Sequence, residues 1–186
     1  MAAEISRAAR RPAALALTAA AFAAVVAVRG ADEDLLVELP FVAALVALAA
    51  IDVERRLLPN RIVYPLAAWG AVATALVDRD DLVEHLLAGS GAFAVLLLIV
   101  LARPRGMGMG DAKLAGAMGV CLGAAVIAAL LVAFLAGALA GLWFVIREGV
   151  AARKRTVPFG VFLALGGIVA VLAGPELIEL YEEALI

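Results

Sequence analysis

Cysteine and histidine are almost missing from this sequence, which has one of each in 186 residues. The single cysteine, Cys121, excludes a disulfide framework or a cysteine-based zinc site built by this chain alone. Polar low-complexity tracts and repeats of fixed period are also missing, and no linker is long enough to separate two folded units. Positive charge is not in excess, because 15 basic residues stand against 17 acidic ones. Without a basic stripe, we expect no nucleic acid partner.

Apolar residues are what the chain has in abundance. They make up 66% of it, and the mean hydropathy is +1.09. A chain this apolar cannot hide its nonpolar surface inside one soluble core, so its surroundings are expected to be mostly lipid. We predict one all-α membrane domain, because the backbone of a lipid-exposed segment must satisfy its own hydrogen bonds and the alternating pattern of a barrel is missing.

The apolar residues fall into segments that are bounded by charged or turn residues. A spanning helix needs about 20 apolar residues, and several segments are shorter. The second segment is therefore expected to begin earlier, near Leu35, and the fifth either to cross partway or to continue into the sixth through Gly123. The prediction is a polytopic bundle of about seven helices, with a cytoplasmic segment at 1–12, a membrane domain at 13–174 and an acidic tail at 175–186. The segments are 13–28, 39–51, 62–77, 86–102, 112–123, 124–146 and 158–173.

Basic residues divide unevenly between the two sides of such a bundle. If the chain starts in the cytoplasm and crosses seven times, 13 of the 15 basic residues fall on the cytoplasmic side, and only Arg29 and Arg79 fall outside. This is the distribution that cytoplasmic loops show, so we predict a cytoplasmic N-terminus. The arginines before the first segment also fit a secretory signal, but the further apolar segments that follow at once favour a first span that is retained.

Two aspartates stand at helix ends on the predicted cytoplasmic side. Asp52 ends the second segment, and Asp111 opens the fifth. A carboxylate near the bilayer is costly and is by default a functional candidate, often with a partner. Two carboxyl groups that share a proton can hydrolyse a peptide, because one accepts a proton from the attacking water and the other donates one. Such a pair requires neither a metal nor a cofactor, although each aspartate alone also fits an ordinary interfacial acid.

The helix dipole suggests different roles for the two acids. A carboxylate is favoured at a helix N-terminus and disfavoured at a C-terminus, so Asp111 is the expected ionised base and Asp52 the expected protonated acid. Coupling between the two groups can reverse this assignment, and the sequence leaves it open.

Glycine is concentrated just before Asp111. Gly106, Gly108 and Gly110 allow the backbone to adopt positive φ and to approach a substrate strand closely. We therefore expect Gly108 and Gly110, together with Lys113, to bind substrate or to shape the loop. A glycine-rich turn is also a common loop, and Lys113 equally fits a lysine that extends its ammonium group to the membrane interface.

Three elements of the chain, in this order, resemble the type IV prepilin peptidases, a family of the GxGD-type intramembrane aspartic proteases. The resemblance covers residues 40–174 and implies that Asp52 and Asp111 are the catalytic pair. It also implies that the partners are prepilin or pseudopilin precursors, whose short basic leader is cut after a glycine at the cytoplasmic face of a bacterial inner membrane. The three elements are the Asp52 segment ending in Leu58-Pro59-Asn60, Gly108-Met109-Gly110-Asp111 with its extension through Lys113 and Leu114, and Pro158-Phe159-Gly160 at the start of the last helix.

The chain departs from the larger members of that family in two ways. Many relatives carry aspartate at the position of Asn60, to which we assign no catalytic role. Larger relatives also insert a cytoplasmic domain with a cysteine cluster and methylate the new N-terminus of the substrate. Since Cys121 is the only cysteine and no such insertion is present, the chain resembles a short, peptidase-only form. Whether a methyltransferase partner acts stays open.

Two other functions are left open by the residues alone. Paired acids in a membrane also serve proton- or ion-coupled transporters, which need polar residues that continue toward the opposite face. The helix interiors here contain mainly Ala, Leu, Val and Gly, with Thr18, Thr74 and Ser90 as occasional exceptions. A catalytically silent assembly subunit is the third hypothesis. The sequence determines neither the oligomeric state nor the particular pilin-like precursor.

Overall fold

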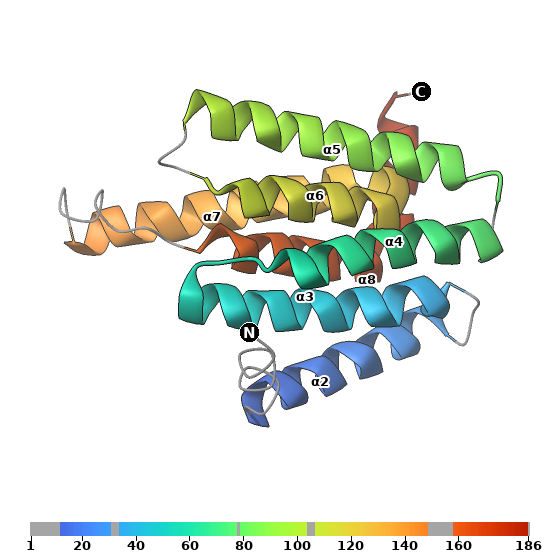
Figure 1. The fold of residues 1–186 in the computed structure, drawn as a ribbon, viewed down its shortest axis with the longest axis horizontal. Coiled ribbons are helices and arrows are strands. Elements are labelled where there is room, and N and C mark those ends of the chain that lie inside the picture. Colours follow the sequence, from blue (N-terminus) through green and yellow to red (C-terminus); the bar gives the residue numbers. More distant parts are fainter. Residues whose placement is uncertain (1–11, 31–33, 78, 104–106, 149–157, 186) are drawn as a thin grey trace.

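The chain folds into a bundle of helices that lie side by side (Figure 1). The computed structural model describes residues 12–30, 34–77, 79–103, 107–148 and 158–185. Within these residues it contains helices and no strand, which confirms the predicted all-α class. The predicted segment before residue 12 and Gly106 lie outside the described residues. The helices are α2 (Pro12–Arg29), α3 (Leu35–Arg55), α4 (Asn60–Val77), α5 (Leu82–Ala102), α6 (Met109–Leu122), the short 3-10 helix η1 (Gly123–Ala125), α7 (Val126–Glu148) and α8 (Phe159–Leu185).

The break between α6 and α7 decides how the helices are counted. With 14 residues, α6 is about 21 Å long, which is less than the hydrocarbon core of about 30 Å. It ends where Gly123 adopts a φ of +57°, a conformation that favours glycine. The fifth predicted helix therefore reaches partway, and η1 leads directly into α7. At η1 the chain turns back, so α7 runs toward the end where α6 begins, and α6 and α7 are two separate helices of the described chain (Figure 1).

The apolar surface of the bundle fits a lipid environment. Three helical stretches in the described chain are long and apolar enough to cross a membrane, namely Leu35–Arg55, Leu82–Ala102 and Met109–Arg147. Outward-facing leucines such as Leu87 and Leu131 are about two-thirds exposed, at 68% and 65%. In water, each Å² of apolar surface left exposed loses the stabilisation of about 25 cal/mol that its burial would provide. In lipid it carries no such penalty.

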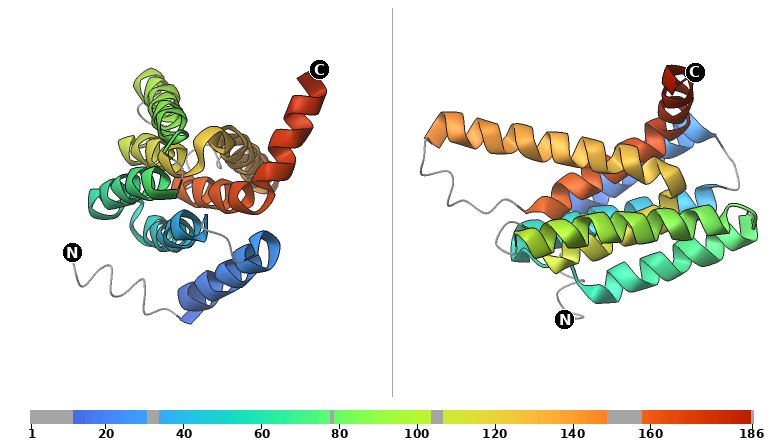
Figure 2. Two further views of the ribbon diagram at one scale, coloured as in Figure 1. Left: turned by 90° about the vertical axis from the view of Figure 1, so that its right-hand side faces the viewer. Right: turned by 90° about the horizontal axis from the view of Figure 1, so that it is seen from above.

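A core of large side chains holds the middle of the bundle together. Phe41, Leu45 and Leu48 of α3 are fully buried with Met118 of α6 and Leu163 of α8. Figure 2 shows the packing from one end of the bundle and from above, with α8 lying between α3 and α7. This core fixes the rotation of α3, α6 and α8 about their axes, so it also fixes which residues their ends present.

Helices α5 and α6 approach each other most closely through glycine. A Cβ atom added at Gly119 of α6 would lie 2.6 Å from the Cα atom of Gly89 in α5, so no side chain fits between the two backbones. Further along the same helix pair, the Nδ1 atom of His85 lies 2.9 Å from the carbonyl oxygen of Val120. A carbonyl only accepts, so His85 Nδ1 donates this hydrogen bond. The α5–α6 pair is thereby held in one register.

The described basic residues gather at one end of the bundle. Arg29 and Arg79 lie at the opposite end, at the end of α2 and in the turn before α5. The alternating direction of the helices produces this separation (Figure 1). The residues at the basic end are Arg55, Arg56, Arg61, Arg103, Lys113 and Arg147.

Candidate active site

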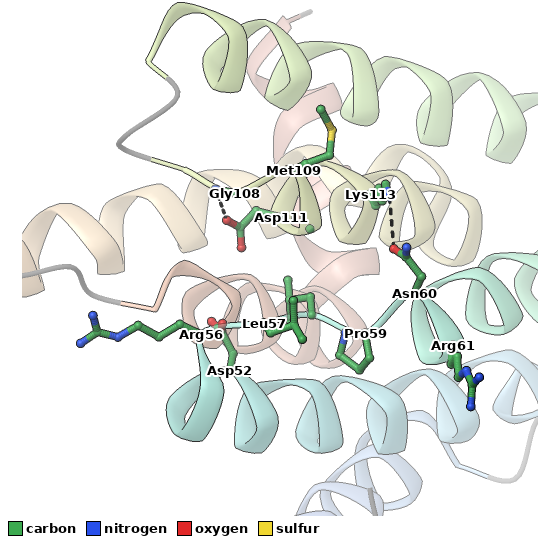
Figure 3. A pocket seen from close by; sticks show the side chains of 12 residues that line it. Asp52, Arg56, Leu57, Pro59, Asn60, Arg61, Gly108, Met109, Asp111 and Lys113 are labelled. Carbon is green, nitrogen blue, oxygen red and sulfur yellow. Dashed lines mark hydrogen bonds between the residues drawn. The ribbon is translucent and has the colours of Figure 1, made fainter. Parts of the chain in front are cut away.

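Asp52 and Asp111 line the same pocket at the basic end of the bundle (Figure 3). The pocket has a volume of about 600 Å³ and is lined by residues from 52–61 and 108–113. Both aspartates are buried, with 5% and 8% of their surface exposed. Figure 3 shows Asp111 pointing from α6 toward the end of α3, where Asp52 lies. The structure thus brings together two carboxyl groups that are 59 positions apart in the sequence.

The first turn of α6 positions Asp111. The backbone N–H of Gly108 donates to Asp111 Oδ2 at 2.9 Å, and the N–H of Asp111 donates to the carbonyl oxygen of Gly108 at 3.1 Å. The bond to the carboxyl group is one half of a capping box, in which the side chain of the third helical residue accepts the N–H of the N-cap residue; Gly108 has no side chain to supply the other half. The carboxylate therefore lies at the positive end of the helix dipole.

Gly108 and Gly110, before Asp111, do not use the positive φ that glycine permits. Gly108 has a φ of −85°, and Gly110 is not among the residues with positive φ. Positive φ is therefore not what glycine provides at either position. Space is limited at Gly110, because a Cβ atom there would lie 3.1 Å from Leu58 Cβ.

Asp52 is held by a helix far away in the sequence. The backbone N–H of Gly160, in the first turn of α8, donates to Asp52 Oδ2 at 2.9 Å. A Cβ atom at Gly160 would lie 2.7 Å from that oxygen. Asp52 ends α3, but its carboxyl group lies at the N-terminus of α8. Both acids therefore face the positive end of a helix, and the dipole no longer distinguishes an acid from a base as expected from the sequence.

A tight turn links Asp52 to the other side of the pocket. Arg56 adopts a left-handed conformation with φ +52° and donates its N–H to the carbonyl oxygen of Asp52 at 2.8 Å. This closes α3 and reverses the chain. The chain then passes through Leu58, which is 6% exposed, and Pro59, whose carbonyl oxygen accepts the N–H of Ile62 at 2.9 Å. The turn ends in the first residues of α4.

Lys113 connects α6 to the start of α4. Its Nζ atom donates to Asn60 Oδ1 at 3.2 Å and lies 5.4 Å from the centre of the Tyr64 ring. A cation over an aromatic ring is attracted to its face. These contacts favour the loop-shaping role among the two predicted for Lys113, because they hold the turn that carries Leu58 against α6.

Sequence reasoning missed Gly160 as a residue of the site. Its signal was the Pro158-Phe159-Gly160 motif at the start of the last helix, but no local pattern connects that motif to Asp52.

The arrangement leaves the second oxygen of each carboxyl group, Oδ1, for a water molecule and a substrate. Two carboxyl groups placed in this way can exchange protons with a water that attacks a peptide carbonyl. Among the described residues, no group of three or more His, Cys, Asp or Glu side chains is placed to hold a metal ion.

The sequence matches one known protein family over most of its length. The model of the type IV leader peptidase family matches residues 39–146. A prepilin leader peptidase/N-methyltransferase of Bacillus subtilis is 33% identical over 171 residues, which are 91% of this chain and 68% of that protein. A protein of the same name from Pseudomonas putida is 34% identical over 80% of this chain and 53% of its own length.

Other relatives of that name extend well beyond the region they share with this chain. One from Aeromonas salmonicida is 29% identical over 74% of this chain and 49% of its own length. The chain thus spans about half the length of several of these relatives and 68% of the Bacillus protein. No solved structure gives a significant match.

Proposed function

This chain belongs to the type IV leader peptidase family, and we propose that it is an aspartic endopeptidase that removes the leader from prepilin or pseudopilin precursors. The cut takes place at the cytoplasmic face of the bacterial inner membrane. One observation carries the proposal, namely that Asp52 and Asp111 line one pocket with a backbone N–H bound to each. Gly108, Gly110 and Lys113 shape that pocket.

The proposed reaction needs one carboxylate and one carboxylic acid. The carboxylate removes a proton from a water molecule while the water oxygen attacks the scissile carbonyl carbon, and the acid donates its proton to the carbonyl oxygen. The tetrahedral intermediate then breaks its C–N bond. The proton taken from water passes to the leaving nitrogen, and a hydroxyl proton of the intermediate returns to the other carboxylate, which restores the starting pair. Since the amide N–H groups of Gly108 and Gly160 hold Oδ2 of each acid, the Oδ1 atoms are the ones that exchange protons.

Because the two carboxyl groups are buried, they can share one proton, as the reaction requires. Two carboxylates close together in a poorly solvated site resist ionising together, so the pair retains one proton over a range of pH and titrates as a unit. The single proton can reside on either acid, and we assign neither to a fixed role. The proposal requires only that Asp52 and Asp111 share it.

The position of the pocket supports cytoplasmic cleavage. It opens at the end of the bundle where the described basic residues gather, and cytoplasmic loops are the ones enriched in Lys and Arg. In this proposal the N-terminus is cytoplasmic, residues 13–174 form the membrane peptidase domain, and residues 175–186 are an acidic segment on the outer side. A precursor leader that stays in the cytoplasm reaches the pocket directly.

The interior of the bundle does not favour a transporter. Apart from the pair, the buried polar side chains in the described chain are Glu38 and Thr74, and both lie toward the opposite end of the bundle. Between them and the aspartates lies the apolar core around Leu45 and Met118. A proton or ion crossing the bundle would meet no polar side chain there, whereas a peptidase needs the pair at one end only.

Co-expression with a precursor tests the proposal. The chain is expressed in bacteria together with a candidate prepilin, and the N-terminus of the mature product is read by mass spectrometry. We expect a cut immediately before the hydrophobic helix of the precursor. Asp52→Asn and Asp111→Asn should each leave the protein in the membrane and abolish that cut, since either change removes the shared proton exchange. Continued cleavage by either variant would overturn the aspartic mechanism.

A further inference from the structure

We propose that Leu58 is a positioning residue that sets the spacing between Asp52 and Asp111. This inference rests on the proposed peptidase function, because it concerns how the same carboxyl pair is held. Leu58 belongs to the Leu58-Pro59-Asn60 motif, which the chemistry of the two acids does not itself explain. The structure places its side chain against both turns that carry the site.

The contacts of Leu58 reach each half of the pair. A Cβ atom at Gly110, the residue before Asp111, would lie 3.1 Å from Leu58 Cβ and 3.6 Å from Leu58 Cδ1. A Cβ atom at Gly160, whose N–H holds Asp52, would lie 3.1 Å from Leu58 Cδ2. Leu58 Cβ and Cδ1 thus face the turn of α6, and Cδ2 faces the turn of α8. Leu58 separates these two turns.

The two acids depend on different helices, so something must set the distance between them. Asp111 is held within α6 by Gly108, and Asp52 is held between α3 and α8 by Gly160. Neither hydrogen bond fixes one carboxyl group relative to the other. A branched side chain wedged between the two turns does so, because packed interiors yield little to compression.

The backbone of Leu58 is itself restricted. A residue before proline is held to extended conformations, and Pro59 follows Leu58 directly. On the other side, the left-handed turn at Arg56 and its hydrogen bond to Asp52 fix where the chain leaves α3. The backbone is therefore fixed on both sides of Leu58. Its burial at 6% exposure also keeps water from the apolar side of the pair.

A graded series at Leu58 tests the proposal. We compare Leu58→Met, Leu58→Val and Leu58→Ala with the same changes at Leu66, which is buried to a similar degree at 5% exposure. Leu66 lies in α4, where its carbonyl oxygen contacts the Cys121 thiol near the far end of α6. Each purified protein is assayed on one precursor for kcat, KM, melting temperature and pH profile. The activity of each variant is expressed per molecule of folded protein.

The expected pattern separates positioning from stability. Removing the branched methyl groups of Leu58 should lower kcat progressively in the order Met, Val, Ala. The loss should reach roughly 10- to 100-fold for Ala, since a misplacement of about 1 Å costs about 100-fold. KM should stay within about twofold, because the outer pocket is intact. The bell-shaped pH profile should narrow, because separated carboxyl groups are less coupled. The Leu66 series should lower the melting temperature and leave kcat and the profile unchanged.

Each other outcome counts against a specific claim. Equal losses of kcat in the Leu58 and Leu66 series, or an unchanged profile in Leu58→Val, would overturn the positioning role while leaving the peptidase in place. If Leu58→Ala does not fold, Leu58→Met and Leu58→Val still supply the order and the profile. Failure of the proposed function is a different result, in which Asp52→Asn still cleaves the precursor.

Discussion

Asp52 keeps its carboxyl group in place through a single glycine of another helix. The N–H of Gly160 donates to Asp52 Oδ2 at 2.9 Å, and a Cβ atom at that position would lie 2.7 Å from the same oxygen. A side chain there would push the carboxyl group away from the amide that holds it. Glycine at residue 160 is thus required by the acid and not by the backbone of α8.

Gly160→Ala should therefore lower the cleavage rate of the molecules that stay folded, in addition to lowering stability. We expect kcat to fall roughly 100-fold, because the displaced carboxyl group loses its geometry, with a loss of about 1–3 kcal/mol in stability from overpacking. The matched control is Gly141→Ala in α7, where an added Cβ atom meets nothing within 4 Å. Cleavage assays and thermal melts in detergent measure both. Equal activity of the two variants would contradict the role of Gly160.

Asn60 gives a second prediction at the scale of single residues. Its Oδ1 atom accepts a hydrogen bond from Lys113, so Asn60→Asp keeps the acceptor and adds an ion pair. We expect Asn60→Asp to retain cleavage within about threefold, since an exposed ion pair contributes about 0–1 kcal/mol. Asn60→Leu removes the acceptor and should lower cleavage more. Loss of cleavage in Asn60→Asp alone would show that charge at this position is harmful.

The residues of the site were predictable from the sequence to different degrees. Asp52 and Asp111 stand out because acids at the ends of apolar helices are unusual. Gly160 and Leu58 do not, because their roles come from contacts between segments that are distant in the chain. Their motifs were visible, but no periodicity or spacing indicates which atoms they meet.

At the scale of helices, the α5–α6 pair depends on close backbone contact. Gly119→Ala would place a Cβ atom 2.6 Å from Gly89 Cα, so the helices must separate. We expect a loss of about 1–3 kcal/mol in stability, measured by thermal unfolding in detergent. Cleavage by the molecules that stay folded should change little, because the contact lies toward the end of α6 away from Asp111.

The control for that variant lies in the same helix pair. Gly91→Ala, in α5, adds a Cβ atom that meets nothing within 4 Å. Since alanine favours the helix over glycine, this change should raise stability by up to about 1 kcal/mol. A destabilisation as large as that of Gly119→Ala would show that the loss arises from glycine flexibility and not from helix contact.

The apolar pattern of the sequence predicted where the helices lie, but it predicted their first and last residues less accurately. The start of α3 at Leu35 is confirmed, although the apolar run begins at Leu39. By contrast, α8 continues to Leu185, past the end of its apolar segment at Ala173. The sequence also left open whether the fifth helix continues into the sixth, because Gly123 alone does not specify a turn. The break there is stabilised by Glu84, whose Oε1 atom accepts the N–H of Ala124 at 3.1 Å.

For the whole molecule, the proposed orientation makes a prediction about access. Arg103→Cys and Arg79→Cys place single thiols on exposed residues at opposite ends of the bundle. Because the native thiol of Cys121 is buried, it adds little background labelling. A membrane-impermeant maleimide applied to spheroplasts should label Arg79→Cys and should label Arg103→Cys only after lysis. The reverse pattern would place the pocket on the outer face and contradict cytoplasmic cleavage.

The whole account depends on Asp52 and Asp111 acting as one unit, and a double-mutant comparison of cleavage measures this directly. Single-turnover rates are determined for the purified wild type, Asp52→Asn, Asp111→Asn and the double variant. Residues that act as a unit are strongly non-additive, so the double variant should cleave no more slowly than either single variant. Losses that multiply in the double variant, or a single variant that retains most of the wild-type rate, would contradict a shared proton between the two acids.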